Sequence, residues 1–141
     1  MNEETPIVVG GPPQRIRASF TISGDALGPD AISAIVGALP DRAFRKGDLG
    51  KHGIPHRTGI WKMSVVASPG QAVPELVDCL LARIPDPKGG WAQLAAKFKI
   101  SLNLMVTISG ENQDFCLSAS QVARLAAVGA SIWIDIYADL S

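Results

Sequence analysis

Basic side chains gather in one segment of the chain, residues 41–62. Six of the 13 lysines and arginines fall there against two aspartates: Arg42, Arg45, Lys46, Lys51, Arg57 and Lys62 against Asp41 and Asp48. Glycines interrupt the 41–58 part, and exposed backbone N–H groups beside arginines can bind a phosphate or a carboxylate. The pattern predicts a candidate site for a small anionic ligand, with charge from Arg45, Lys46 and Arg57, one of them oriented by Asp48.

The same loop also has a purely structural interpretation. Asp48 can pair with Arg45 or Arg57 and hold the crossover in place, since charges on a surface usually bind nothing specific. His52 and His56 are four residues apart, a spacing that suits metal ligands on a helix. Glycine and proline lie between the two histidines and break such a helix. We therefore expect no metal and no cofactor.

Catalytic signatures are missing from the sequence. It contains no G-x-S-x-G, no Walker loop and no dinucleotide fingerprint. Cys79 and Cys116 have no histidine partner suggested by the local sequence. Both lie in apolar patterns that predict buried, free thiols, with a disulfide as the less favoured alternative. Because catalytic triads can assemble from distant residues, the question of an activity stays open. The sequence favours a non-catalytic protein.

Length and charge narrow the class of protein further. The chain has 141 residues, with 13 basic and 13 acidic side chains. This predicts one globular domain whose overall field attracts neither nucleic acid nor an acidic membrane. The N-terminus has no apolar signal region, and no segment reaches the ~18 apolar residues of a membrane span. We expect a cytoplasmic protein that binds no membrane, with nucleic acid a disfavoured partner.

Two strands with the same alternation of side chains form the framework of the predicted fold. Residues 15–23 and 100–109 alternate apolar and polar side chains, and each segment ends in T-I-S followed by a glycine. A period of two turns one side of a strand into a core, so Ile22 and Ile108 should be buried. Another strand resumes at Gly59, and Trp61 lies on its core parity. Trp61 and Trp91 are expected to be core anchors rather than ligand contacts.

Helices and a last strand complete the pattern. Helical spacing predicts a helix that begins at Pro29 and ends before Pro40, and further helices over 72–84 and 88–98. Ser118 and Gln121 form a capping box before another helix, which Gly129 closes. Residues 131–138 alternate again, which places Ile132, Ile134 and Ile136 inward and Trp133, Asp135 and Tyr137 outward.

The order of these elements predicts an α+β fold. It is a ferredoxin-like duplication of split β-α-β units, with an antiparallel or mixed sheet and helices on one face. The pseudo-repeats are 15–67 and 99–139, joined by helices within 72–98, in a single domain 15–141 that follows a flexible tail, 1–14. We expect the first and third strands at the centre of the sheet and the second and last at its edges. A domain swap or a barrel-like closure is the less favoured alternative.

Helices on one face leave the other face of the sheet open. That face should present Arg17, Met105, Trp133 and Tyr137, together with Lys62 and small polar side chains. Arginine, methionine, tryptophan and tyrosine are enriched at protein interfaces. The alternative is ordinary aromatic cover on a half-exposed sheet. A non-catalytic protein-interaction module is the favoured function, with a protein partner or self-association through this face. It could be a homodimer, or an immunity-type or regulatory protein that covers the surface of another protein.

Several short motifs carry a family resemblance. They are Leu27-x-Pro29-Asp30-x-Ile32, Lys46-Gly47-Asp48, Gly59-x-Trp61 and Gly129-Ala130-x-Ile132-x-Ile134-Asp135-Ile136-Tyr137. With these motifs the chain resembles the bacterial domain-of-unknown-function family 4279 (DUF4279) over roughly residues 15 to 138. The resemblance implies a small α+β domain and brings no catalytic residues with it.

Overall fold

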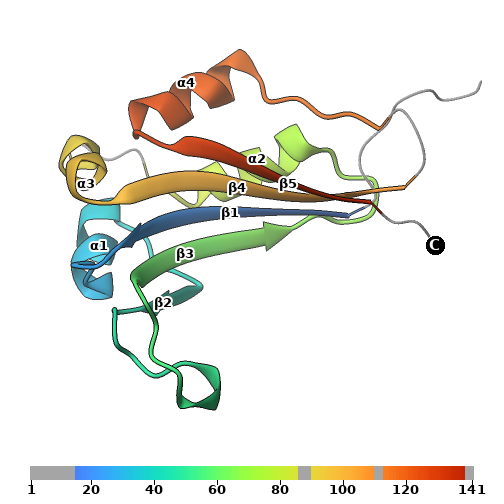
Figure 1. Ribbon diagram of the computed structural model, residues 1–141. Coiled ribbons are helices and arrows are strands. Elements are labelled where there is room, and N and C mark those ends of the chain that lie inside the picture. The colour runs from blue at the N-terminus through green and yellow to red at the C-terminus, as the bar shows by residue number, and fades with distance from the viewer. Residues whose placement is uncertain (1–14, 86–89, 110–112, 139–141) are drawn as a thin grey trace, which may run out of the picture.

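The computed structural model describes residues 15–85, 90–109 and 113–138. The elements in chain order are β1 (Arg15–Gly24), α1 (Pro29–Val36), β2 (Arg42–Phe44), the 3-10 helix η1 (Lys51–Gly53), β3 (Gly59–Val66), α2 (Val73–Ala82), α3 (Trp91–Lys97), β4 (Lys99–Ile108), α4 (Ala119–Ala127) and β5 (Ser131–Ala138). The predicted mixed α+β fold is confirmed, and Figure 1 shows the strands side by side in one sheet. The predicted tail, 1–14, lies outside the described residues.

The strand order is β2-β3-β1-β4-β5. As predicted, the first and third strands of the sequence pattern, β1 and β4, are neighbours inside the sheet. β3 is not at the edge, because β2 pairs with it and places Ala43 opposite Trp61. The prediction that residues 41–58 form a connection without a strand is therefore wrong. The three residues of β2 precede the first glycine of the segment, and an edge pairing this short leaves no periodic signal in the sequence.

The ferredoxin-like arrangement of split β-α-β units is not confirmed. In a split unit another strand lies between the two strands that the helix connects. Here β1 and β3 are direct antiparallel neighbours, and β4 and β5 are direct parallel neighbours. Alternation within a strand indicates which face is apolar, but it does not indicate which strands pair.

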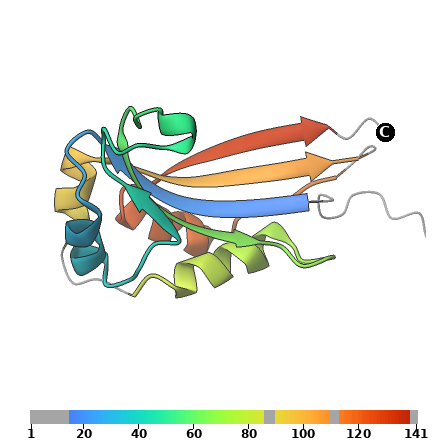
Figure 2. The ribbon, with the colours of Figure 1, turned by 90° about the horizontal axis from the view of Figure 1, so that it is seen from below.

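One face of the sheet forms the core, with the parity that the sequence predicts for the two long strands. Its buried side chains come from β1 (Ile16, Ala18, Phe20, Ile22), β3 (Trp61, Met63) and β4 (Ile100, Leu102, Leu104, Val106). Figure 2 shows the helices on this side of the strands and the loop that carries η1 on the other. Ile108, at the end of β4, is half-buried instead of buried. Trp61 is fully buried, and its indole N–H donates to Ser33 Oγ at 2.9 Å.

β5 departs from the prediction of a buried apolar side. Ile132, Ile134 and Ile136 lie on the helix side of the sheet, in register with the buried residues of β4. They are nevertheless 38%, 47% and 61% exposed. The reason is the position of α4, which packs on α2 instead of on β5: Gln121 Nε2 donates to Asp78 Oδ1 at 2.7 Å. The alternation of β5 shows which residues share a side, but not whether a helix covers it.

The capping of α4 agrees with the sequence, whereas the burial of the cysteines does not. Ser118 Oγ accepts from the N–H of Gln121, whose side chain accepts from the N–H of Ser118. Gly129 follows α4 with φ +77°, as a residue after a helix often does. Cys79 and Cys116 are free thiols, as predicted, but both are exposed. The prediction of buried thiols, made from apolar neighbours in the sequence, is therefore wrong.

Candidate functional site: the open face of the sheet

The sheet face opposite the helices carries the residues that the sequence predicts for an interface. Its side chains lie in rows across β1, β4 and β5: Arg15, Thr107 and Tyr137; then Arg17, Met105 and Asp135; then Ser19, Asn103 and Trp133. Three neighbouring strands therefore bring Arg17, Met105, Trp133 and Tyr137 onto one face. We call this surface the open face.

Small polar side chains form the middle of the open face and are bonded to one another. The hydroxyl oxygens of Ser19 and Ser64 are 2.9 Å apart. Asn103 Nδ2 donates to Thr21 Oγ1 and to Ser101 Oγ, both at 3.1 Å. These contacts fix the side chains before any partner arrives, so binding here needs little rearrangement.

A cavity of about 270 Å³ hollows one end of the open face. Its lining includes Arg15 and Arg17 from β1, Met105 from β4 and Tyr137 from β5. Met105 is 40% exposed and Tyr137 is 51% exposed. Trp133, in the row of Ser19 and Asn103, is 66% exposed. The hollow thus combines apolar walls with two guanidinium groups. Such a lining fits a side chain with an apolar stem and an acidic end.

Positive charge collects on the open face although the whole chain is neutral. The strands place five cations on it, Arg15, Arg17, Arg42, Lys62 and Lys99, and one acid, Asp135. Among the described residues the ion pairs join Lys46 to Asp25 and Arg83 to Asp41. The five cations of the open face therefore have no carboxylate partner in that part of the chain. Arg42 instead lies 5.3 Å from the ring centre of Phe44.

Sequence reasoning missed three of these cations, Arg15, Arg42 and Lys99. Arg15 and Lys99 share the strand parity of residues that the sequence did place outward, Arg17 and Met105. These two cations could have been identified from the sequence by counting the charges on each face of a strand instead of over the whole chain. Arg42 could not be placed from the sequence, because it lies on β2, which is too short to show a periodic pattern.

Of the residues predicted for an anion site on the 41–58 loop, Asp48 holds the loop itself together. Asp48 Oδ2 accepts from the backbone N–H of Arg45 at 2.7 Å, so it orients the backbone and not a guanidinium. His56 stacks on Phe44, with ring centres 3.5 Å apart. Arg57 is exposed, and its side chain takes part in none of the polar contacts found among the described residues. These contacts agree with the structural interpretation of the loop.

Lys46 has a partner outside the loop. Its Nζ lies 3.2 Å from Asp25 Oδ2 in the turn after β1. Hydrogen bonds from Lys46 first and from Thr58 second hold the pKa of Asp25 below its ordinary value. The Arg45 guanidinium also lies beside this turn, within 3.8 Å of where a Cβ on Gly28 would be. An anion at the loop would have to compete with Asp25 for Lys46.

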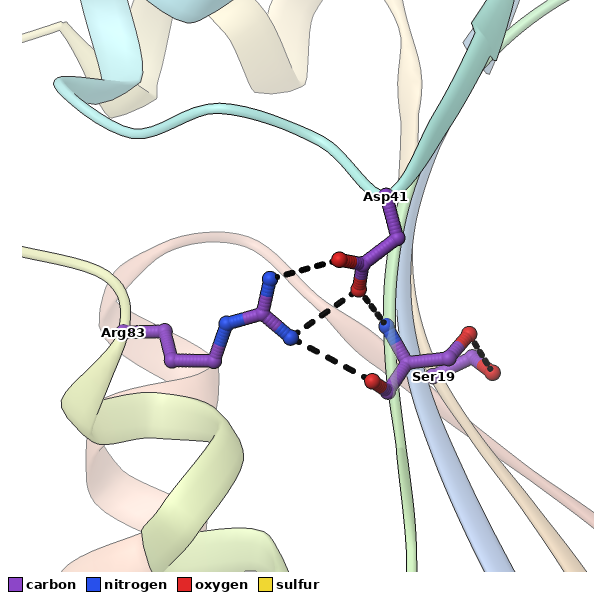
Figure 3. A network of polar contacts seen from close by, with 4 residues as sticks. Ser19, Asp41 and Arg83 are labelled. Carbon is purple, nitrogen blue, oxygen red and sulfur yellow. Dashed lines mark hydrogen bonds and ion pairs between the residues drawn. The ribbon is translucent and has the colours of Figure 1, made fainter.

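A polar network that the sequence did not indicate ties α2 to the sheet (Figure 3). Arg83 follows α2 and donates to both carboxylate oxygens of Asp41, at 2.9 Å each, and to the carbonyl of Ser64 at 3.2 Å. Asp41 Oδ2 also accepts from the N–H of Ser64 at 2.8 Å. The hydrogen bonds from Arg83 and then from Ser64 hold the pKa of Asp41 below its ordinary value. Through Ser64 the network reaches Ser19 on the open face.

Metal-binding geometry is not found in the described ranges. Residues 15–85, 90–109 and 113–138 contain no group of three or more histidine, cysteine or acidic side chains that could hold an ion. His52 has φ +61° within η1, and His56 contacts Phe44 instead of His52. The loop therefore presents the two histidines in different surroundings.

Comparison with known proteins identifies a family and nothing more specific. A family model described as "Domain of unknown function (DUF4279)" matches residues 14–139. No curated protein and no solved structure matches the chain. Among the described residues, every helix is too short or too polar to cross a membrane.

Proposed function

The chain belongs to the DUF4279 family, and we propose that it works as a non-catalytic protein-interaction module whose open face binds an acidic surface of a partner protein. One observation carries the proposal. Arg15 and Arg17, which have no carboxylate partner among the described residues, line a hollow together with Met105 and Tyr137. An acidic side chain of a partner supplies the missing counter-charge.

The lining of the hollow makes such a contact favourable. A carboxylate that enters between Arg15 and Arg17 forms charge-assisted hydrogen bonds, which are stronger than neutral ones. With the partner in place, Met105 and Tyr137 keep water away from these hydrogen bonds, and this strengthens the attraction between the carboxylate and the two arginines. Exposed Trp133 adds a large apolar area beside the hollow, and aromatic residues of this kind often dominate binding energy at interfaces.

The charge of the open face also selects among partners. Two copies that met face to face would bring ten cations together, because each face carries five. Like charges across an interface are unfavourable, so a different, acidic protein is favoured over a homodimer through this face. An immunity-type or regulatory protein that covers an acidic surface of its target has this chemistry. We place the role in the cytoplasm, where the exposed thiols of Cys79 and Cys116 stay reduced.

A double substitution tests the proposal. Trp133→Ser with Tyr137→Ser removes apolar area from two exposed positions, and Leu39→Ser with Val122→Ser is a control at two other exposed positions. Each tagged protein is used for affinity capture from the source cells, and mass spectrometry identifies what is retained. We expect the wild type and the control to retain the same partner and the open-face variant to lose it.

Two outcomes contradict the proposal. One is a folded open-face variant that keeps the partners and the association state of the wild type. The other is an open-face variant that fails to fold while the control folds, because both aromatic side chains would then belong to the core.

A small anionic ligand on the 41–58 loop is the second candidate. The observation that favours it is that Arg57 is exposed and has no polar partner among the residues that the structure describes. The contact between Lys46 and Asp25 disfavours it, since that charge is already used. Replacing Arg57 separates the two candidates, because Arg57 lies in the loop and not on the open face.

A further inference from the structure

A second cavity lies on the helix side of the sheet, away from the open face. Its volume is about 150 Å³, and its lining includes Phe20 of β1, Leu81 and Ile84 at the end of α2, Trp91 of α3, and Arg124 of α4. Residues of three helices and of the central strand therefore line it. We call it the helix-side cavity.

Trp91, which lines the helix-side cavity, has an unsatisfied hydrogen-bond donor. The side chain is 7% exposed, and its ring packs edge-on against Phe20 with ring centres 5.8 Å apart. Its indole N–H is buried and has no hydrogen-bond partner in the part of the chain that the structure describes. The other buried tryptophan, Trp61, has its N–H bonded to Ser33. Buried polar groups are almost always paired, so the helix layer around Trp91 is packed less favourably than that around Trp61.

Arg124 brings a positive charge to the same cavity. Its Nη2 donates to the carbonyl oxygens of Leu81 and Ile84, both at 2.8 Å. These two bonds anchor the guanidinium at the end of α2. The ion pairs among the described residues do not include Arg124, so no carboxylate there compensates its charge. The remaining N–H groups of the guanidinium are available to an acceptor.

We propose that the helix-side cavity binds a small carboxylic acid with an apolar body about the size of a benzene ring. The carboxylate accepts hydrogen bonds from the free N–H groups of Arg124, while the apolar body packs against Phe20, Leu81 and Ile84, beside the ring of Trp91. The guanidinium of Arg124 only donates, which selects a ligand with an acceptor group. An apolar cavity of this volume can hold a benzene-sized molecule. The proposal goes beyond the interaction module, because it uses the opposite face of the sheet.

The packing of α4 fits such a ligand. α4 buries only Gln121 and Leu125 of its own residues, so its contact with the rest of the helix layer is limited. A ligand between α2, α3 and α4 adds apolar contacts where the helix has few. We therefore expect binding to raise the melting temperature as well, since the ligand stabilises the folded state.

Indole N–H signals in proton–nitrogen correlation spectra give a direct readout. The three tryptophans, Trp61, Trp91 and Trp133, each contribute one signal, and Trp91→Phe assigns that of Trp91. The probe is benzoate, and benzyl alcohol is the matched ring without the charge. We expect benzoate to shift the Trp91 signal saturably and to leave that of Trp133 in place. Benzyl alcohol should bind about tenfold more weakly or worse, a loss typical of a removed charge contact.

Variants add a second test. Arg124→Met should weaken benzoate binding by about tenfold or more, whereas Lys97→Met, a control at an exposed cation on α3, should not. No saturable shift of Trp91 up to about 10 mM benzoate overturns the proposal, and so does equal binding of benzyl alcohol. If Arg124→Met does not fold, the comparison of benzoate with benzyl alcohol on the wild type decides alone.

Discussion

Arg83 holds Asp41 through both of its terminal nitrogens, each 2.9 Å from a carboxylate oxygen. The contact joins the end of α2 to the residue before β2. Asp41 in turn accepts from the N–H of Ser64 on β3, so one carboxylate connects a helix and two strands. The residues are 42 positions apart in sequence, and the contact depends on how α2 lies along the sheet. No local pattern could indicate it.

This contact predicts a pH-dependent part of the stability. Because Arg83 lowers the pKa of Asp41 below its usual 3.8, the carboxylate stabilises the fold above that value and stops doing so as the pH falls through the lower folded-state pKa. We expect Asp41→Asn to lower the free energy of unfolding by about 0.5–1 kcal/mol at about pH 7, since the pair is partly exposed. Urea denaturation should show this difference vanish by about pH 2. An equal difference at both pH values would show that the charge of Asp41 is not involved.

A matched pair of core substitutions tests the uneven cover of the sheet. Leu104 on β4 is 1% exposed, whereas its neighbour in register on β5, Ile134, is 47% exposed. We expect Leu104→Ala to lower the free energy of unfolding by about 2–5 kcal/mol, and Ile134→Ala by less than about 1 kcal/mol. Chemical denaturation measures both. A loss of similar size at the two positions would mean that a helix covers β5 in solution.

Close packing after α4 predicts a sensitive glycine. Gly129 has φ +77°, and a Cβ there would lie 2.7 Å from the Cβ of Ala95. Gly70 has φ +80° with nothing within 4 Å of a Cβ, so it serves as the control for backbone strain alone. We expect Gly70→Ala to cost about 1 kcal/mol and Gly129→Ala clearly more. Equal losses in thermal or urea denaturation would mean that α3 moves away easily.

The sequence predicts well those features that depend on one element at a time. Alternation identifies the buried sides of β1 and β4 correctly. Both strands lie inside the sheet, where the apolar side of a strand faces the core. The capping box of Ser118 and Gln121 is equally local. β5 alternates as regularly as β4, yet its isoleucines stay exposed, since their cover depends on α4. Gln121 draws α4 to α2 through contacts 43 and 47 residues away in sequence.

For the candidate site, too, the sequence predicts what depends on a single strand and not what depends on how the strands pair. The sequence places Arg17, Met105, Trp133 and Tyr137 on one face, because strand parity alone decides this. It does not show that cations outnumber acids there, since the neutral total hides a segregation that appears only when the strands are paired. The helix-side cavity has no signal in the sequence, because its walls come from three helices whose packing no single periodicity records.

Thermal shift with inorganic phosphate examines the 41–58 loop. We expect no rise in the melting temperature at about 10 mM phosphate, because Lys46 is already held by Asp25. Arg45→Ala and Arg57→Ala should leave this flat response unchanged. A rise in the wild type that both variants abolish would favour the loop as a ligand site.

The most direct test of the central claim is quantitative capture of the partner by two charge-reversal variants. Arg17→Glu reverses a charge in the hollow of the open face, and Arg57→Glu reverses one on the loop. Each variant and the wild type capture proteins from the same isotope-labelled cell extract, and mass spectrometry gives the ratio of partner recovered. We expect Arg17→Glu to recover about tenfold less partner than the wild type, because it opposes an acidic surface with a like charge, and Arg57→Glu to recover as much. Undiminished recovery by Arg17→Glu, or a loss confined to Arg57→Glu, would contradict the assignment of the open face as the binding surface.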